Sequence, residues 1–238
     1  MMKERTTQIL SALIKDFVEN AAPVASKKLL ENHNFDVSSA TIRNEFALLE
    51  EVGLIESPHV SAGKVPTVQG YRYFVDELMK PEQYQDEIKE TFQKYVTTYK
   101  LQKAKETAFD ALRVLSHLSG NVAFAHIDND RTIYIGLSHF VRSPEFAQDP
   151  NAIAQIVEVL EGKQRLHNFL SNQKIELGDV KIFIGEENLL EEISSCAMLV
   201  TPFQSQNIEG KIGIIGPMRM NYGYNKALLK EIISLIAL

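Results

Sequence analysis

The sequence has few of the residues that build disulfide scaffolds and membrane spans. It contains one cysteine, Cys196, in 238 residues, which excludes an intramolecular disulfide framework and favours a reducing compartment. No apolar run approaches the roughly 18 residues that a membrane-spanning helix needs. The polar start of the chain, residues 1–8, does not resemble a signal peptide. These absences predict a cytoplasmic globular protein that has no membrane partner.

Positive charge is also scarce. The net charge is −6, and residues 1–80 hold nine Lys and Arg against eleven Asp and Glu. Proteins that bind nucleic acid usually carry a basic footprint, so the totals argue mildly against such a partner. From residue 53 to residue 72, however, the only acid is Glu56, against Lys64 and Arg72. A small basic surface is therefore possible, and charge alone leaves the question open.

The first fifty residues predict three helices joined by short turns. Apolar residues at helical spacing mark the first helix over 9–18, and residues 26–33 favour a second. Ser38 or Ser39 can cap a third helix that runs to residue 51, with Gly53 as its stop. This order is that of a helix-turn-helix.

The third helix has one apolar face and one polar face. Ile42, Phe46 and Leu49 share the apolar face, which predicts that Arg43, Asn44 and the alanines face outward. Arg can pair with guanine, Asn with adenine, and an alanine methyl can contact a thymine methyl. The alternative is an ordinary surface helix whose Arg43 pairs with an acid. The DNA contacts predicted on this helix are Ser38, Ser39, Thr41, Arg43, Asn44 and Ala47, the first three of them to phosphates.

The segment after this helix predicts a β-wing. Residues 54–57 have the character of a strand, Pro58–Gly63 forms a small-residue loop, and residues 64–68 can return as the second strand. The alternative is a plain surface hairpin. The DNA contacts predicted on and after the wing are His59, Ser61, Gly63, Lys64 and Arg72.

The rest of the chain predicts a linker and a second domain. Glu82–Leu118 is long, charged and free of glycine, so we expect a helix that links domains and pairs with a copy of itself. The predicted domains are residues 1–80 for DNA binding, 81–118 for linkage and dimerisation, and 119–238 for regulation. The predicted fold class is α+β. Beyond Leu118, strands are expected at 122–127, 132–137, 180–184, 197–201 and 211–215, and helices at 152–161, 163–171 and from 225 to the end.

Other clusters predict little chemistry. His126 with Asp128 and Asp130 could hold a divalent metal, but the acids are better explained by a hairpin turn. Cys196 is expected to be a packed small hydrophobe. Arg219 and Asn221 could line a ligand pocket or form a structural turn. Nothing assembles into a catalytic site, so we expect no enzyme, no cofactor and no bound metal.

Two groups of motifs resemble a known family. Those near the C-terminus are Gly185-Glu-Glu-Asn188, Leu190-Glu191, Cys196 and Gly213-Ile-Ile-Gly-Pro-Met-Arg-Met-Asn-Tyr222. Those near the N-terminus are Ala22-Pro-Val24, Ser38-Ser-Ala-Thr-Ile-Arg-Asn-Glu45, Leu49-Glu50, Gly53, Pro58-His59, Ser61-Ala-Gly63, Pro66 and Gly70-Tyr-Arg-Tyr-Phe-Val-Asp76. They resemble HrcA, the heat-inducible transcription repressors of bacteria.

The resemblance implies a fold and a function. It implies an N-terminal winged helix and a GAF-like effector domain, in a homodimer that binds double-stranded DNA. The implied operator is CIRCE, an inverted repeat upstream of chaperone operons. The implied partner is the chaperonin GroEL, which supports the active repressor until heat stress draws it away. The implied reading helix is residues 38–51 and the implied wing is residues 58–66.

The chain departs from the family in length. Members are usually about a hundred residues longer, and here residues 123–127 lead almost directly to a stretch starting at Tyr134 that resembles a segment far downstream. The skipped part would include some sheet of the GAF-like domain, which is therefore expected to be reduced, and an inserted dimerising domain. The helix over 82–118 becomes the expected substitute for the dimer interface. Two alternatives stay open. One is a ligand-sensing winged-helix regulator with an effector in the GAF-like domain, and the other is a winged helix that binds protein instead of DNA.

Overall fold

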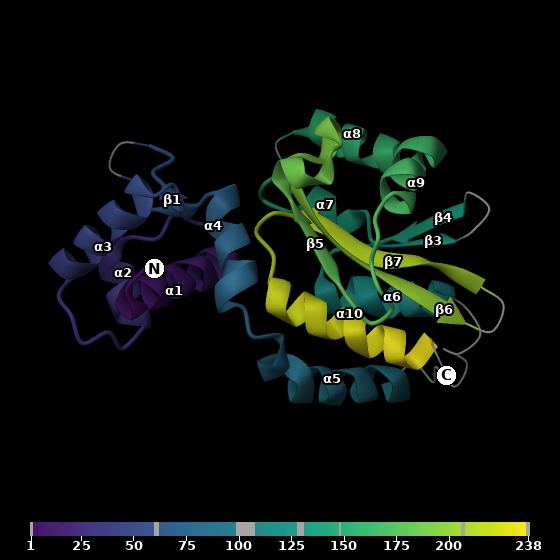
Figure 1. The fold of residues 1–238 in the computed structure, drawn as a ribbon, viewed down its shortest axis with the longest axis horizontal. Helices are drawn as coiled ribbons and strands as arrows, with labels where there is room; N and C mark the ends of the chain where they lie inside the picture. The colour runs from purple at the N-terminus through teal and green to yellow at the C-terminus, as the bar shows by residue number, and fades with distance from the viewer. Residues whose placement is uncertain are drawn as a thin grey trace. The chain divides into compact units, whose positions relative to one another are not determined.

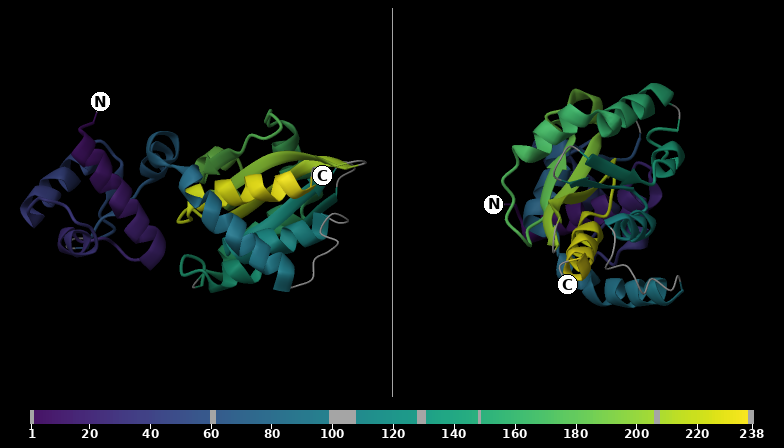
Figure 2. Two further views of the ribbon diagram at one scale, coloured as in Figure 1. Left: turned by 90° about the horizontal axis from the view of Figure 1, so that it is seen from below. Right: turned by 90° about the vertical axis from the view of Figure 1, so that its right-hand side faces the viewer.

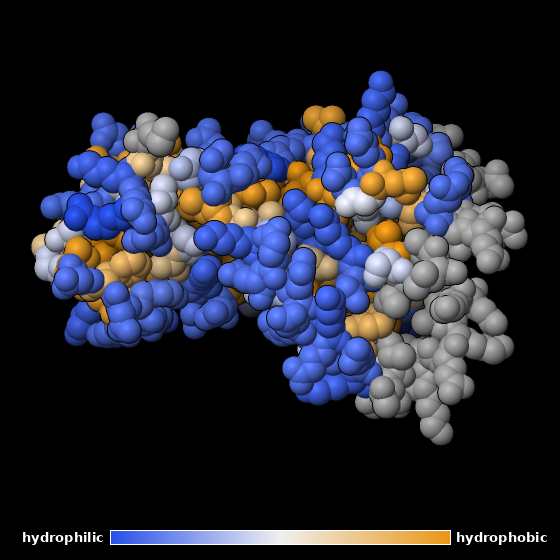
Figure 3. Space-filling view, turned by 60° about the horizontal axis from the view of Figure 1, so that its bottom comes forward, coloured by the Kyte–Doolittle hydropathy of each residue, from blue (hydrophilic) through white to orange (hydrophobic). Residues whose placement is uncertain are grey.

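The computed structural model describes residues 2–59, 62–98, 108–127, 131–147, 149–205 and 208–236. The chain divides into two compact units, residues 1–79 and 80–238 (Figure 1). Each unit has its own hydrophobic core and is described by itself. Most of the surface drawn in Figure 3 is hydrophilic, with apolar residues in patches between the polar ones.

The N-terminal unit is a helical bundle with a two-stranded wing. Its strands, β1 (Ile55–Glu56) and β2 (Val65–Pro66), pair antiparallel with Ile55 opposite Pro66. Its helices are α1 (Glu4–Asn20), α2 (Ser26–Asn32), α3 (Ser39–Glu51) and α4 (Val68–Tyr73), and α4 continues as the π-helical turn η1 (Phe74–Leu78). The order of helices followed by a wing confirms the winged-helix prediction.

The third helix begins and ends as the sequence predicts. The Ser38 side chain accepts a hydrogen bond from the backbone N–H of Thr41, which makes Ser38 the N-cap. Gly53 has φ of +74°, and the N–H groups of Gly53 and Leu54 donate to the carbonyls of Glu50 and Leu49. This pair of bonds is a Schellman motif, which turns the chain sharply from α3 into β1.

The C-terminal unit is built on an antiparallel sheet. In the described part of the chain its strand order is β4-β3-β7-β6-β5. The strands are β3 (Val122–Ile127), β4 (Arg131–Ile135), β5 (Lys181–Ile184), β6 (Cys196–Ser205) and β7 (Ile208–Pro217). The helices are η2 (Pro81–Tyr84), α5 (Gln85–Thr98), α6 (Ala108–Ser119), α7 (Ser138–Arg142), α8 (Pro150–Glu161), α9 (Lys163–Ser171), η3 (Gly185–Asn188), η4 (Glu191–Ile193) and α10 (Tyr222–Ile236).

Helices cover both faces of this sheet. Strand residues alternate between the faces, so Val122 and Phe124 join one cluster with α8 and α9, while Ala123 and Ala125 face the other way. α7, α8 and α9 lie on the first side, and α6 and α10 cover the second (Figures 1 and 2). Both faces are therefore buried, which explains why the strands are apolar without a clear polar alternation.

The segment predicted as a linker carries two described helices. α5 packs against α10 on the side away from the sheet, and α6 packs on β3 and α10 (Figure 2). Ile88 and Phe92, two apolar residues of α5, are buried within the C-terminal unit. Residues 99–107 lie outside the described part of the chain. Dimerisation through residues 81–118 stays a prediction, and the exposed residues of α5 that remain for it are mainly charged.

The α+β fold class is confirmed. The strands and helices expected beyond residue 118 are present, but β6 and β7 are ten residues long because their pairing continues at both ends, from Cys196 opposite Pro217 to Ser205 opposite Ile208. The short helix α7 was not predicted. β3 and β4 pair directly, with Ile127 opposite Arg131, where the resemblance expects the skipped segment. No helix among the described residues combines the length and the apolar character that crossing a bilayer requires.

Candidate nucleic-acid interface

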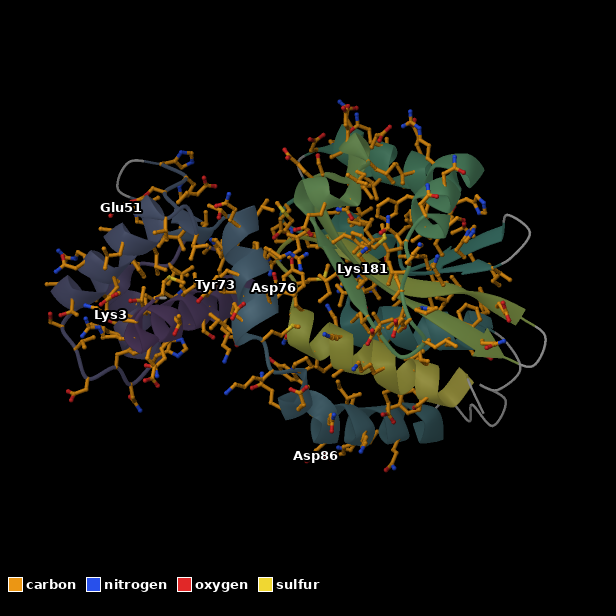
Figure 4. All side chains as sticks on the ribbon, in the orientation of Figure 1. Lys3, Glu51, Tyr73, Asp76, Asp86 and Lys181 are labelled. Carbon is orange, nitrogen blue, oxygen red and sulfur yellow. The ribbon has the colours of Figure 1, made fainter. Side chains whose placement is uncertain are left out.

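The face of α3 predicted to read DNA points away from the core. Ile42, Phe46 and Leu49 are buried beneath the helix. Ala40, Arg43, Asn44 and Ala47 are exposed, as is Glu51 at the end of the helix (labelled in Figure 4). Arg43 forms no ion pair with any residue that the structure describes. Its guanidinium group is therefore available to a partner outside the chain.

The N-terminus of α3 is open to solvent. Ser38 is exposed, and Ser39 and Thr41 are partly exposed. The hydroxyls of Ser38 and Thr41 lie 3.1 Å apart and share a hydrogen bond. Backbone N–H groups and the helix dipole favour an anion at such a terminus, so the exposure of these side chains is compatible with the predicted phosphate contacts, which stay a prediction.

A buried carboxylate joins α3 to α1, a feature that the sequence analysis missed. Glu45 is 3% exposed on the core face of α3. It accepts hydrogen bonds from Arg5 Nε and Nη2 at 2.8 and 2.6 Å and from Thr6 Oγ1 at 2.7 Å. Burial raises the pKa of Glu45, but the bonds from Thr6 and Arg5 outweigh it and hold this pKa below its usual value. An acid on an otherwise apolar helical face was the signal that could have shown it.

A second buried carboxylate joins α1 to α2. Asp16 is 4% exposed and accepts hydrogen bonds from His33 Nε2 at 2.8 Å and from the Asn32 amide at 2.9 Å. These partners lie at the turn between α2 and α3. Together, Asp16 and Glu45 connect α1 to the turn of the helix-turn-helix and to the middle of α3, which fixes the orientation of α3 on α1.

The wing is fastened to the end of α3 by close backbone contacts. The Thr67 hydroxyl donates to the Gly53 carbonyl at 2.6 Å, and the Thr67 N–H donates to the Leu54 carbonyl at 3.1 Å. A Cβ at Gly70 would lie 2.0 Å from the Leu54 carbonyl oxygen. Gly70 therefore lets α4 approach the backbone that follows α3, and it explains the glycine of the Gly70-Tyr-Arg motif.

Close packing against the backbone of Val24 explains why residue 63 is a glycine. A Cβ there would lie 2.6 Å from the carbonyl carbon of Val24. Next to it, Lys64 and Val24 exchange two backbone hydrogen bonds of 2.9 Å, which tie the wing to the turn between α1 and α2. A DNA contact by Gly63 stays a prediction, but the close packing accounts for the residue without one.

The remaining predicted contacts differ in their surroundings. His59 is exposed in the wing loop, and Ser61 lies outside the described residues. Arg72 on α4 forms an ion pair of 3.1 Å with Asp76, which is labelled in Figure 4. Lys64 forms an ion pair with Glu50 on α3, with 2.6 Å between Nζ and Oε2. Two of the predicted basic contacts are thus neutralised within the protein.

The other sequence-predicted clusters have structural roles. Asp128 and Asp130 lie outside the described residues, and no set of three or more ligating side chains occurs in the part of the chain that the structure describes. Cys196 is fully buried in the sheet, and burial raises the pKa of its thiol to about 12. Arg219 pairs with Glu145, and the Asn221 side chain accepts from the Tyr224 N–H at the start of α10. These contacts account for the turn without a ligand, and the ligand-sensing alternative stays a prediction.

One solved structure shares the overall fold. It is described as a hypothetical protein at 2.2 Å resolution, with a TM-score of 0.74 and 17% sequence identity, over 99% of this chain and 96% of that chain. At this identity the likeness supports the fold alone.

Curated relatives match nearly the whole chain. The heat-inducible transcription repressor HrcA of Shouchella clausii is 25% identical over 336 aligned positions, which cover 99% of this chain and 96% of the relative. The protein of the same name from Symbiobacterium thermophilum is 28% identical over 335 positions, with 98% and 97% covered. Because this chain has 238 residues, about a hundred of those positions have no residue here. The shorter length expected from the resemblance is thus confirmed.

The family model described as the HrcA protein C-terminal domain matches residues 73–224, more than half of the chain. The relatives carry the name of transcription repressors and not of enzymes. The chain therefore belongs to the HrcA family of heat-inducible transcription repressors.

Proposed function

We propose that this chain represses heat-shock chaperone operons by binding, as a homodimer, to an inverted-repeat DNA operator of the CIRCE type. One observation carries the proposal: the outward face of α3 presents Arg43 and Asn44 between two alanines, while the buried Glu45 joins the core face of the helix to α1. Small residues on either side allow the helix to enter a major groove closely.

In this proposal each part of α3 has its own task. Arg43 pairs with a guanine, Asn44 pairs with an adenine, and Ala47 contacts a thymine methyl. Ser38, Ser39 and Thr41 hold phosphates at the N-terminus, where the helix dipole favours negative charge. Base contacts supply the sequence preference, and phosphate contacts set the register of the helix on the duplex.

The wing is proposed to follow the DNA beside α3. His59 and Ser61 lie in its loop, Gly63 gives it room, and Lys64 and Arg72 are the cations nearest in sequence. Arg72 must leave Asp76 to contact a phosphate. The wing therefore contributes little to the affinity for DNA, and most of the specificity comes from α3.

A dimer compensates for the small basic surface. Twofold symmetry places two reading helices on the two halves of an inverted repeat, so that the modest affinity of one copy is combined with that of the second. We propose that the copies meet through the C-terminal unit, with residues 81–118 as the candidate segment. The absence of about a hundred positions found in longer relatives makes a different dimer contact necessary if theirs lies in that part.

The response to heat is proposed to arise from limited stability. A domain whose folding free energy is small loses a large share of its active population for about 1–2 kcal/mol. The chaperonin GroEL would restore that population in the cytoplasm until stress draws it to other substrates. A melting transition far above the stress temperature of the host would contradict this part of the proposal.

Fluorescence anisotropy tests the proposed function. The full chain is titrated onto a CIRCE-type repeat and onto a scrambled duplex, at two salt concentrations and with or without GroEL. We expect tight, salt-dependent binding that favours the repeat, because base contacts discriminate while phosphate contacts do not. Equal binding to both duplexes would reject the operator, and stabilisation by a small effector alone would favour the ligand-sensing alternative.

A further inference from the structure

The wing meets the reading helix through a cluster of three polar side chains. Lys64 Nζ lies 2.6 Å from Glu50 Oε2 and 2.7 Å from Ser57 Oγ, and Ser57 Oγ lies 3.3 Å from Glu50 Oε1. Lys64 directly precedes β2, Glu50 lies in the last turn of α3, and Ser57 directly follows β1. We call this cluster the wing clamp. The Lys64 side chain is only 17% exposed, so its cation faces the protein.

The backbone of the same residue holds the other side of the wing. The Lys64 N–H donates to the Val24 carbonyl, and the Val24 N–H donates to the Lys64 carbonyl, each at 2.9 Å. Val24 lies in the turn between α1 and α2. Gly63 lets the two backbones approach this closely. Lys64 is thus bonded on one side to the helix-turn-helix core and on the other to the reading helix.

We propose that Lys64 is a positioning residue of the DNA interface, which clamps the wing to α3 through Glu50 and does not contact phosphate. The inference rests on the proposed function, because it assigns the clamp to a DNA-reading surface. Glu50 follows Arg43 by seven residues, which places both on the same side of α3 about 10 Å apart along its axis. The clamp therefore fixes the distance between the wing and the arginine that reads bases.

The charges support this assignment. If Lys64 left the clamp for a phosphate, Glu50 would keep a negative charge at the edge of the DNA, where it is repelled. The hydrogen bond from Lys64 lowers the pKa of Glu50 below its usual value, so Glu50 stays ionised and paired at neutral pH. Breaking the pair thus removes a favourable contact and adds an unfavourable one.

The chain offers a matched pair of variants to test the clamp without DNA. Glu50→Gln removes the acid of the clamp, and Glu51→Gln removes the same charge one residue further, on an exposed side chain. Hydrogen exchange is followed at the amides of Val24 and Lys64. We expect these amides to exchange roughly two- to fivefold faster in Glu50→Gln, the range that partly exposed ion pairs contribute, and at the wild-type rate in Glu51→Gln. Equal rates in both variants would overturn the proposal.

The salt dependence of operator binding tests the second half of the proposal. In Lys64→Met we expect weaker binding at every salt concentration, with the same slope of log K against log salt as the unchanged chain. A slope smaller by about 0.9 per subunit would show a lost phosphate contact and would overturn the proposal. Lys94→Met, which removes the cation of an exposed pair with Glu90 on α5, controls for net charge.

The two readouts separate the clamp from the proposed function. If the unchanged chain does not bind the operator, the proposed function fails, while hydrogen exchange at Val24 and Lys64 still decides whether the clamp exists. If the operator is bound and the wing amides do not respond to Glu50→Gln, the clamp fails and the proposed function stands.

Discussion

The two units of the chain differ in the kind of internal contact that stabilises them. In the N-terminal unit, two carboxylates, Asp16 and Glu45, are buried between helices. In the described part of the C-terminal unit, the buried polar groups are hydroxyls, amides and one histidine, and no Asp, Glu, Lys or Arg is buried. There the residues of one sheet face form a continuous apolar cluster with α8 and α9, and apolar residues on the other face are buried as well. The smaller N-terminal unit has less apolar area to bury, so directional charged bonds fix its geometry.

This difference fits the roles proposed for the two units, which are DNA reading for the N-terminal unit and regulation for the C-terminal unit. If α3 reads DNA as proposed, it must keep its orientation within a fraction of an ångström to align Arg43 and Asn44 with base edges, and buried charged hydrogen bonds specify one geometry. A sheet core with many apolar contacts stabilises without such directional bonds. The comparison predicts that the units respond differently to core truncation, to loss of charge and to pH.

The largest effect is expected from truncating the C-terminal core. Phe124 on β3 is fully buried in the apolar cluster on one face of the sheet. Phe124→Ala should destabilise the C-terminal unit by about 3–5 kcal/mol, because it removes apolar contacts and leaves a cavity. Amide hydrogen exchange, measured peptide by peptide, should be faster in the strands of the C-terminal unit and unchanged in α1 to α3. Equal acceleration in both units would show that they do not unfold separately.

The N-terminal counterpart is the loss of a buried charge. Glu45→Gln should destabilise the N-terminal unit by about 2 kcal/mol, because hydrogen bonds to a charged group contribute roughly 1.5–3 kcal/mol each. The amides of α1 and α3 would report it by exchange, with Glu51→Gln as the exposed control. A variant as stable as the control would remove Glu45 from its role as the joint between the helices.

Some features of the N-terminal unit could be predicted from the sequence and others could not. Helical spacing and the stop at Gly53 predicted α3, because local periodicity and capping determine a helix boundary. The partners of Glu45 could not be predicted, because Arg5 and Thr6 lie about forty residues away and meet it only through the fold. The pairing of Lys64 with Glu50 could not be predicted for the same reason, because it depends on how the wing folds back; a DNA contact by Lys64 stays a prediction.

The third effect concerns binding rather than stability. Arg43→Ala should weaken operator binding by about 1–3 kcal/mol, as expected for loss of a base contact, and should affect a scrambled duplex less. Anisotropy titrations on both duplexes measure it. Unchanged operator affinity in a folded variant would favour the alternative of an ordinary surface helix.

The smallest effect is a change in pH dependence. The pKa of Glu45 is lower in the folded unit than its ordinary value of 4.5, so its contribution to stability is present above about pH 4.5. That contribution is lost as the pH falls through the lower, folded pKa. Urea denaturation at pH 7 and pH 3 should therefore show a difference between wild type and Glu45→Gln that shrinks in acid. A constant difference would contradict this pKa shift.

The arrangement of half-sites tests the central claim most directly. The wild-type chain is titrated onto a duplex with two half-sites as an inverted repeat and onto one with the same half-sites as a direct repeat. If α3 reads DNA from a twofold symmetric dimer, the inverted repeat is bound much more tightly. Equal affinity for the two duplexes would contradict the account.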